Sequence, residues 1–190
     1  MSDRIPKVLS HYYEKANGPF RSLSDLPPDQ AEQVLASIRK VGNSFASKRA
    51  SDYLTVRAEL EGRVRQLFIE KGGQPKRSHP HSMILGTSAW LKSWYQNGQE
   101  ISVPLAHFAP DSVSFTYGDL FPAMRYQDGK SYRGQVYLMA ELESLINHFG
   151  LPQDWNADGL FGPDRYIEAQ VWDDQPLLPF LPEFDTTDEA

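Results

Sequence analysis

The spacing of apolar residues changes at Gly72-Gly73, and this change limits the possible folds more than any other feature of the sequence. Before these glycines, apolar residues recur every three or four positions in two stretches, from Ala31 to Val41 and from Tyr53 to Phe68, as on amphipathic helices that begin near 25–28 and near Ser51. After them, short segments alternate apolar and polar residues, which is typical of β-strands. We therefore predict an α+β protein with an N-terminal helical subdomain and a mainly antiparallel, helix-flanked sheet.

Proline and glycine mark the ends of the two helices. Pro28 is tolerated in a first turn, because the N–H that it lacks has no partner there. Gly42 stands where a C-cap glycine is common. The apolar stripes are Ala31, Val34 and Ile38 on the first helix and Val56, Leu60 and Val64 on the second. We expect the helices to pack against each other through these stripes.

Turn residues divide the rest of the chain into short segments. We expect strands at 81–85, 100–103, 112–117, 135–138 and 165–172, and helices at 88–95 and 142–149. The predicted organisation is an N-terminal unit at 1–78, formed by an extended segment at 8–13 and the two helices, an α+β core at 79–182, and an acidic disordered tail at 183–190.

Several classes of protein are excluded by what the sequence lacks. It has no cysteine, which rules out disulfides, thiolate zinc sites, iron–sulfur clusters and a cysteine nucleophile. No apolar run approaches the roughly 18 residues of a membrane span, and Met1 to Lys7 contain no apolar leader segment. We therefore expect a cytoplasmic protein with no membrane partner.

Charge is distributed unevenly along the chain. Residues 39–77 carry ten basic and four acidic side chains, whereas residues 78–190 carry five basic and sixteen acidic ones. A basic block of this kind suits an anionic partner, such as nucleic acid or a phosphate-bearing compound, and the alternative is an ordinary solvated helix surface. The candidate binding residues are Arg57, Arg63, Arg65, Lys76 and Arg77.

The late strand at 165–172 carries the clearest candidate site, because alternation puts its side chains on two faces. The apolar face holds Ile167, Ala169 and Val171, and the other face holds Tyr166, Glu168, Gln170 and Trp172. On a cleft wall, the aromatic rings would stack on a flat ligand. Glu168 would accept hydrogen bonds from a sugar hydroxyl or stabilise a developing cation. The alternative is that this second face is simply solvated.

Motifs for other chemistries are absent or incomplete. His79 and His81 have a spacing that suits a shared metal, with Asp119 or Asp128 as further ligands. No third ligand stands at a recognisable spacing, so we predict no metal site and keep a metal-dependent nuclease or phosphatase as an alternative. The dinucleotide-binding, Walker and Gly-x-Ser-x-Gly motifs are absent. The segment 117–119, Tyr-Gly-Asp at the end of an expected strand, is either an ordinary turn or the edge of a site.

The segment 166–172, followed by 173–178, resembles the closing strand of ADP-ribosyltransferase-fold enzymes, a family made up largely of bacterial toxins and defence proteins. Leu85-Gly86-Thr87-Ser88 is similar to the His-Gly-Thr or His-Gly-Ser segment that ends the family's first strand, and 115–119 is similar to its second strand. The resemblance covers about residues 80–180. Leu85 stands in the place of the family's histidine, there is no Ser-Thr-Ser motif, and Glu168-x-Gln170 replaces a Glu-x-Glu pair.

The resemblance implies an NAD-dependent enzyme that modifies a macromolecular acceptor, protein or nucleic acid, with an antitoxin or regulator as a further partner. Glu168 would be catalytic, and the basic helical segment would form a lid or an acceptor surface. The NAD-binding residues that the resemblance implies are His81, Tyr117, Gln170 and Trp172, with His11 as the alternative to His81. The alternative function is a non-catalytic binding or regulatory module with a basic helical surface.

Overall fold

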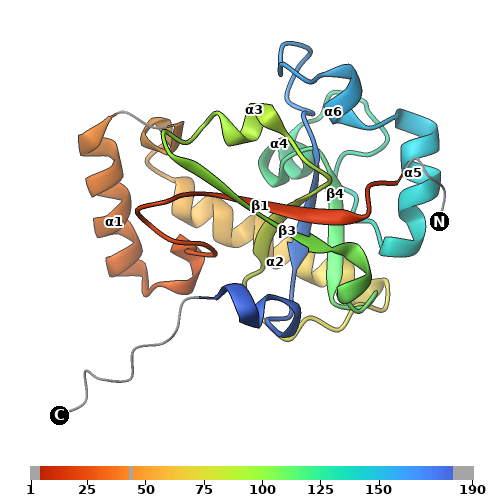
Figure 1. Ribbon diagram of the computed structural model, residues 1–190, viewed down its shortest axis with the longest axis horizontal. Coiled ribbons are helices and arrows are strands. Elements are labelled where there is room, and N and C mark those ends of the chain that lie inside the picture. The colour runs from red at the N-terminus through yellow and green to blue at the C-terminus, as the bar shows by residue number, and fades with distance from the viewer. Residues whose placement is uncertain (1–4, 43–44, 182–190) are drawn as a thin grey trace.

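The computed structural model describes residues 5–42 and 45–181, and it confirms the α+β class. Five strands form one sheet in the order β3-β1-β2-β5-β4, and every neighbouring pair is antiparallel. The strands are β1 (Val8–Glu14), β2 (His81–Leu85), β3 (Gly98–Pro104), β4 (Val113–Tyr117) and β5 (Ile167–Val171). The extended segment expected at 8–13 is therefore part of the sheet, and Figure 1 shows β1 crossing the middle of the molecule.

Helices cover the sheet and its ends. The α-helices are α1 (Pro28–Val41), α2 (Tyr53–Glu70), α3 (Ala89–Lys92), α4 (Leu120–Arg125), α5 (Leu142–Phe149) and α6 (Pro152–Trp155). The 3-10 turns are η1 (Leu23–Asp25), η2 (Phe45–Lys48), η3 (Leu105–His107), η4 (Met139–Glu141) and η5 (Gln175–Phe180). In Figure 1, α1 and α5 lie at opposite ends and α2 runs behind the strands. None of the helices in the described ranges is both long and apolar enough to cross a membrane.

The two faces of the sheet belong to different clusters of buried side chains. One face is the main apolar core, which contains Ile167, Ala169 and Val171 of β5 together with residues of α5. The other face is covered by α2 and α4, and Trp172, directly after β5, packs there against Leu60, Val64 and Phe68. The alternation predicted for the late strand is thus confirmed, but both of its faces are buried.

The predicted packing of α1 against α2 is wrong. The stripe of α2 packs on α4 and Trp172, while Val34 of α1 is 41% exposed. The buried residues of α1 are Ala31 and Leu35, and α1 lies against η1 and η2. Helical spacing showed which face of α2 is buried, but the Trp172 surface that covers it lies a hundred residues further along the chain.

The strand predicted at 135–138 is also wrong, because only Tyr137 pairs. It forms an isolated bridge with Phe115, with N–O distances of 2.9 and 2.8 Å. The chain turns at Gly134 just before this bridge and enters η4 at Met139 just after it, so there is no room for a longer ladder. The tail predicted at 183–190 lies outside the described residues.

Candidate functional site

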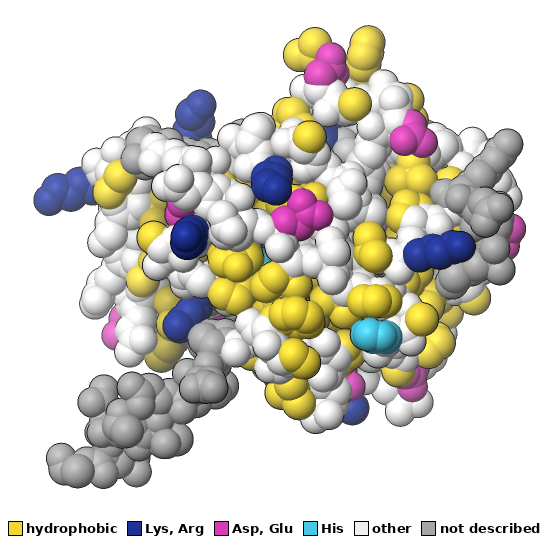
Figure 2. Space-filling model, viewed as in Figure 1, with side chains coloured by type: hydrophobic (Ala, Val, Ile, Leu, Met, Phe, Trp, Pro, Cys, Tyr) yellow, Lys and Arg dark blue, Asp and Glu magenta, His cyan; other side chains and the backbone are white. Residues whose placement is uncertain are grey.

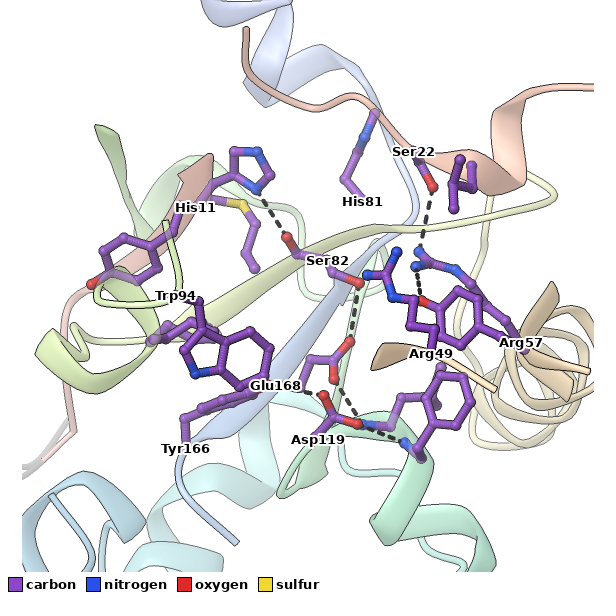
Figure 3. A pocket seen from close by; sticks show the side chains of 18 of the residues that line it. His11, Ser22, Arg49, Arg57, His81, Ser82, Trp94, Asp119, Tyr166 and Glu168 are labelled. Atoms are coloured by element: carbon purple, nitrogen blue, oxygen red, sulfur yellow. Dashed lines mark hydrogen bonds between the residues drawn. The ribbon is translucent and has the colours of Figure 1, made fainter. Parts of the chain in front are cut away.

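A cavity of about 480 Å³ lies on the face of the sheet that α2 and α4 cover. Its walls come from β1, β2 and β5, the loop at 20–23, the segment at 49–57 and the start of α4. Its volume falls within the range of roughly 300–1,000 Å³ that is typical of small-molecule sites. In Figure 3, Glu168 and Asp119 extend into the middle of the cavity.

Glu168 is the second residue of β5, and it is only 6% exposed. One carboxyl oxygen accepts a hydrogen bond from Leu120 N–H at 2.7 Å, and the other accepts one from the Ser82 hydroxyl at 3.0 Å. Burial, and after it the charge of Asp119, raises the pKa of Glu168 from 4.5 to about 8, although both hydrogen bonds oppose this. The carboxyl group is therefore mostly protonated at neutral pH.

Asp119 stands at the start of α4, directly after β4. Its carboxylate caps the helix by accepting from Phe121 N–H at 2.9 Å, and it also accepts from the Tyr166 hydroxyl at 2.9 Å. The turn into α4 needs glycine at Gly118, because φ there is +96° and a Cβ would lie 2.8 Å from an oxygen of Asp164. The 117–119 segment is therefore both a turn and the edge of this cavity.

His11 and His81 both line the cavity, and both already have partners. His11 Nε2 accepts from Phe20 N–H at 2.9 Å, so its proton is on Nδ1, which lies 3.1 Å from the Ser82 carbonyl oxygen. Burial lowers the pKa of His11 to about 4. His81 Nε2 lies 2.7 Å from an oxygen of Asp174, and Figure 3 shows its ring extending away from Glu168.

Three of the predicted NAD-binding residues do not line the cavity and are at most 1% exposed. Tyr117 lies in the main apolar core, on the other face from Glu168, and donates to the carbonyl oxygens of residues 149 and 150. Gln170 accepts from Ser114 and donates to Thr116. Trp172 donates to Ser114. The interpretation of this face as one cleft wall is corrected: α2 covers its C-terminal part, and Glu168, though buried, lines the cavity.

The predicted basic surface also does not form as expected, since its members are engaged with other parts of the chain. Arg57 lines the cavity but binds Glu61 at 2.7 Å together with Ser22, Ser24 and Tyr53. The others hold carbonyl oxygens or carboxylates: Arg63 binds Met124, Arg65 binds Pro75 and Arg77, Lys76 pairs with Asp173, and Arg77 pairs with Asp25 and Asp174. Figure 2 shows the Lys and Arg side chains of one face as separate groups.

The histidines considered as metal ligands do not converge. His79 Nδ1 lies 3.0 Å from Glu61, and His81 contacts Asp174 instead. Within residues 5–42 and 45–181, no three His, Asp or Glu side chains are grouped so that they could hold a metal ion.

Sequence reasoning missed the roles of Ser82, Asp119 and Arg49 in this cavity. Asp119 had a signal, a strand end followed by glycine, but Ser82 and Arg49 had none. Arg49 comes from the connection between the two N-terminal helices, where no periodicity applies. In comparisons with protein-family models, curated proteins and solved structures, no match to this chain was found.

Proposed function

We propose that this chain is an enzyme that acts on a glycosidic bond in the Glu168 cavity, with ADP-ribosyl transfer from NAD as its reaction. The observation that carries the proposal is the pair of carboxyl groups in one cavity, with Glu168 protonated at neutral pH and Asp119 held by two hydrogen-bond donors. Acid–base sites are commonly built from two carboxyl groups whose environments separate their pKa values. The cavity is also concave and partly dehydrated, as catalysis requires and as a flat binding surface would not be.

The two carboxyl groups would interact with the positive charges of the substrate and of its transition state. Asp119 would stabilise the oxocarbenium-like centre that develops when a glycosidic bond breaks. The nicotinamide ring of NAD is cationic, and a cation beside Glu168 would lower the pKa of that side chain and release its proton. When the C–N bond breaks, its electron pair goes to nicotinamide. The acceptor then forms the new bond, and its proton passes to the ionised Glu168.

The non-catalytic alternative depended mainly on a basic helical surface. Four of its five basic residues do not line the cavity and bind other parts of the chain, and the fifth, Arg57, pairs with Glu61. These five residues therefore do not form an exposed row of free cations. The enzyme proposal has the stronger support.

The test is release of nicotinamide from NAD by the wild type, Glu168→Gln and Asp119→Asn, with melting temperature measured with and without NAD. We expect NAD to raise the melting temperature, and we expect Glu168→Gln to slow release by roughly 10²- to 10³-fold. Glu143→Gln, the same change at an exposed site on α5, is the matched control and should have no effect. If NAD does not raise the melting temperature of the wild type and the wild type does not release nicotinamide, NAD is rejected as the donor. Equal turnover in Glu168→Gln would reject Glu168 as the catalytic residue.

A further inference from the structure

Arg49 is a partly buried cation without a counter-ion in the described part of the chain. Its guanidinium carbon lies 4.3 Å above the ring centre of Tyr53, and the side chain lines the Glu168 cavity. Its hydrogen bonds with residues 5–42 and 45–181 involve the backbone alone, and its guanidinium group forms no hydrogen bond or ion pair with these residues. Arg57, on the same side of the cavity in Figure 3, is by contrast held by Glu61. Only one of these two neighbouring guanidinium groups is therefore free to bind a ligand.

The lack of a counter-ion at Arg49 has an energetic cost. Burial lowers the pKa of Arg49, which shows that its surroundings disfavour the charge, although Tyr53 and Asp119 partly offset this. Arginine nevertheless stays charged in proteins, and a dehydrated charge without a partner is unfavourable. An anion bound at Arg49 would remove that cost. Its planar fork of N–H donors suits the oxygens of phosphate and carboxylate groups.

Two further arginines favour an anion that carries more than one negative charge. Arg21 and Arg125 also line the cavity, both are exposed, and neither has an ion pair with the described part of the chain. On the floor, Asp119 supplies a negative charge while Glu168 is mostly neutral. Three cations without an ion pair to the described residues thus line the cavity, against the carboxylates of Asp119 and the exposed Asp52. Three guanidinium groups offer more N–H donors than a single carboxylate can accept, so a phosphoryl group or a pyrophosphate fits them better.

We propose that Arg49, with Arg21 and Arg125, forms a phosphate-binding subsite, so that the ligand of this cavity is a phosphorylated, hydroxyl-bearing compound such as a sugar phosphate or nucleotide. The phosphate would lie at Arg49, and the hydroxyl-bearing part would reach Glu168 and Asp119. Arg49 lies outside residues 80–180, so the subsite is independent of the sequence resemblance. The inference rests on the proposed function in that it assigns phosphate to the same cavity, but it can be tested without turnover.

The test is calorimetric titration of the wild type, Arg49→Gln, Arg49→Lys and Lys40→Gln with inorganic pyrophosphate at constant ionic strength. We expect Arg49→Gln to bind roughly 10- to 100-fold more weakly, because hydrogen bonds to charged groups are the strong ones. Arg49→Lys should bind with intermediate affinity, because it keeps the charge and loses the planar fork. Lys40→Gln removes the same charge from an exposed position on α1, outside the cavity, and should bind like the wild type.

The melting temperature of the free variant gives a second readout. Arg49→Gln should melt at the same temperature as the wild type or higher, because it removes an uncompensated charge, so weaker binding cannot be attributed to unfolding. The proposal is overturned if the wild type does not bind pyrophosphate, if Arg49→Gln binds equally well, or if Lys40→Gln loses as much affinity. Succinate, a dicarboxylate, should bind more weakly than pyrophosphate, and equal or tighter binding would overturn the assignment to phosphate.

The two proposals fail in different ways. Pyrophosphate binding that depends on Arg49, without release of nicotinamide from NAD, would keep the subsite and reject the reaction. Turnover of NAD with the same KM in the wild type and Arg49→Gln would keep the reaction and reject the subsite.

Discussion

Asp164 and Glu168 lie four residues apart, and both side chains are almost completely buried, at 0% and 6% exposed. Asp164 accepts hydrogen bonds from Arg133 at 2.6 Å, Lys130 at 2.8 Å and the Tyr132 hydroxyl at 2.7 Å. Burial alone would raise its pKa, but these partners outweigh burial and lower it. Glu168 has only neutral donors and a second carboxylate nearby, and its pKa rises to about 8.

The difference shows that burial does not decide the state of a carboxyl group; the charges of its partners do. The Asp164 cluster neutralises its carboxylate and joins the loop after α4 to the start of β5. The Glu168 cavity leaves its carboxyl group without a cationic partner in direct contact, which keeps it available for chemistry. The same substitution, carboxylate to amide, should therefore have opposite effects in the two regions.

The largest effect is expected for Asp164→Asn. The change leaves Arg133, which is 6% exposed at its side chain, without its closest counter-charge. Removing one partner of a buried ion pair typically lowers the free energy of unfolding by about 3–5 kcal/mol. Urea denaturation at pH 7 measures this cost. Asp158→Asn is the control, because it is exposed and the amide oxygen can still accept from Leu160 N–H. A loss no larger than that of the control would mean that the cluster does not hold the fold.

The next effect is the pH dependence that Glu168→Gln should remove. Between pH 4.5 and about 8, the folded protein holds a proton on Glu168 that the unfolded chain has lost. The free energy of unfolding must therefore fall as pH rises through this window. Glutamine cannot ionise, and its amide can still accept from Leu120 N–H. The variant should match the wild type near pH 4 and be more stable at pH 9.

Denaturation curves at pH 4, 7 and 9 test this expectation, with Glu143→Gln as the control for a change of charge alone. Equal pH dependence in the wild type and Glu168→Gln would show that Glu168 has an ordinary pKa. The contrast with Asp164 would then fail, and with it the main support for acid–base chemistry in the cavity.

Local patterns in the sequence predicted the elements of the fold well. The ends of α1, α2 and α5 follow from Gly42, Gly72 and Gly150, and alternation separated the two faces of β5 correctly. These signals act within a few residues, where backbone conformation and side-chain spacing decide the outcome.

What covers each face depends on contacts between distant segments, and no local pattern in the chain indicates these contacts. Gln170 and Trp172 were interpreted as cleft residues, but the apolar stripe of α2 packs over that end of β5. Lys76 and Arg63 looked free because their partners, Asp173 and Met124, lie 97 and 61 residues away along the chain. Glu168 was found because it shares its face with Tyr166 in any register that buries Ile167.

The smallest effect is expected at His11, a half-buried group whose pKa moves from 6.5 to about 4. This shift in pKa is smaller than that of Glu168. It makes the protein less stable as pH falls, whereas the shift of Glu168 makes it less stable as pH rises. Nε2 must stay unprotonated to accept from Phe20 N–H, and Phe20 has an unusual φ of +54°, a conformation that costs roughly 1–2 kcal/mol for a residue with a side chain. The hydrogen bond and the stacking of the two rings, with centres 4.2 Å apart, hold this turn against the cavity.

Because the folded pKa of His11 is depressed, its contribution to stability is complete above about pH 6.5 and is lost as pH falls toward 4. His11→Gln keeps an acceptor near the position of Nε2 but cannot be protonated. We expect it to be less stable than the wild type at pH 7 by about 1 kcal/mol, the typical net value of a hydrogen bond, and to lose less stability between pH 6.5 and 4. His81, which also lines the cavity, remains in both proteins, and its charge contributes to the lowered pKa of His11, so the difference between their slopes reports His11 together with its interaction with His81. Parallel slopes would mean that His11 is not the neutral acceptor, and that the turn at Phe20 is held by packing.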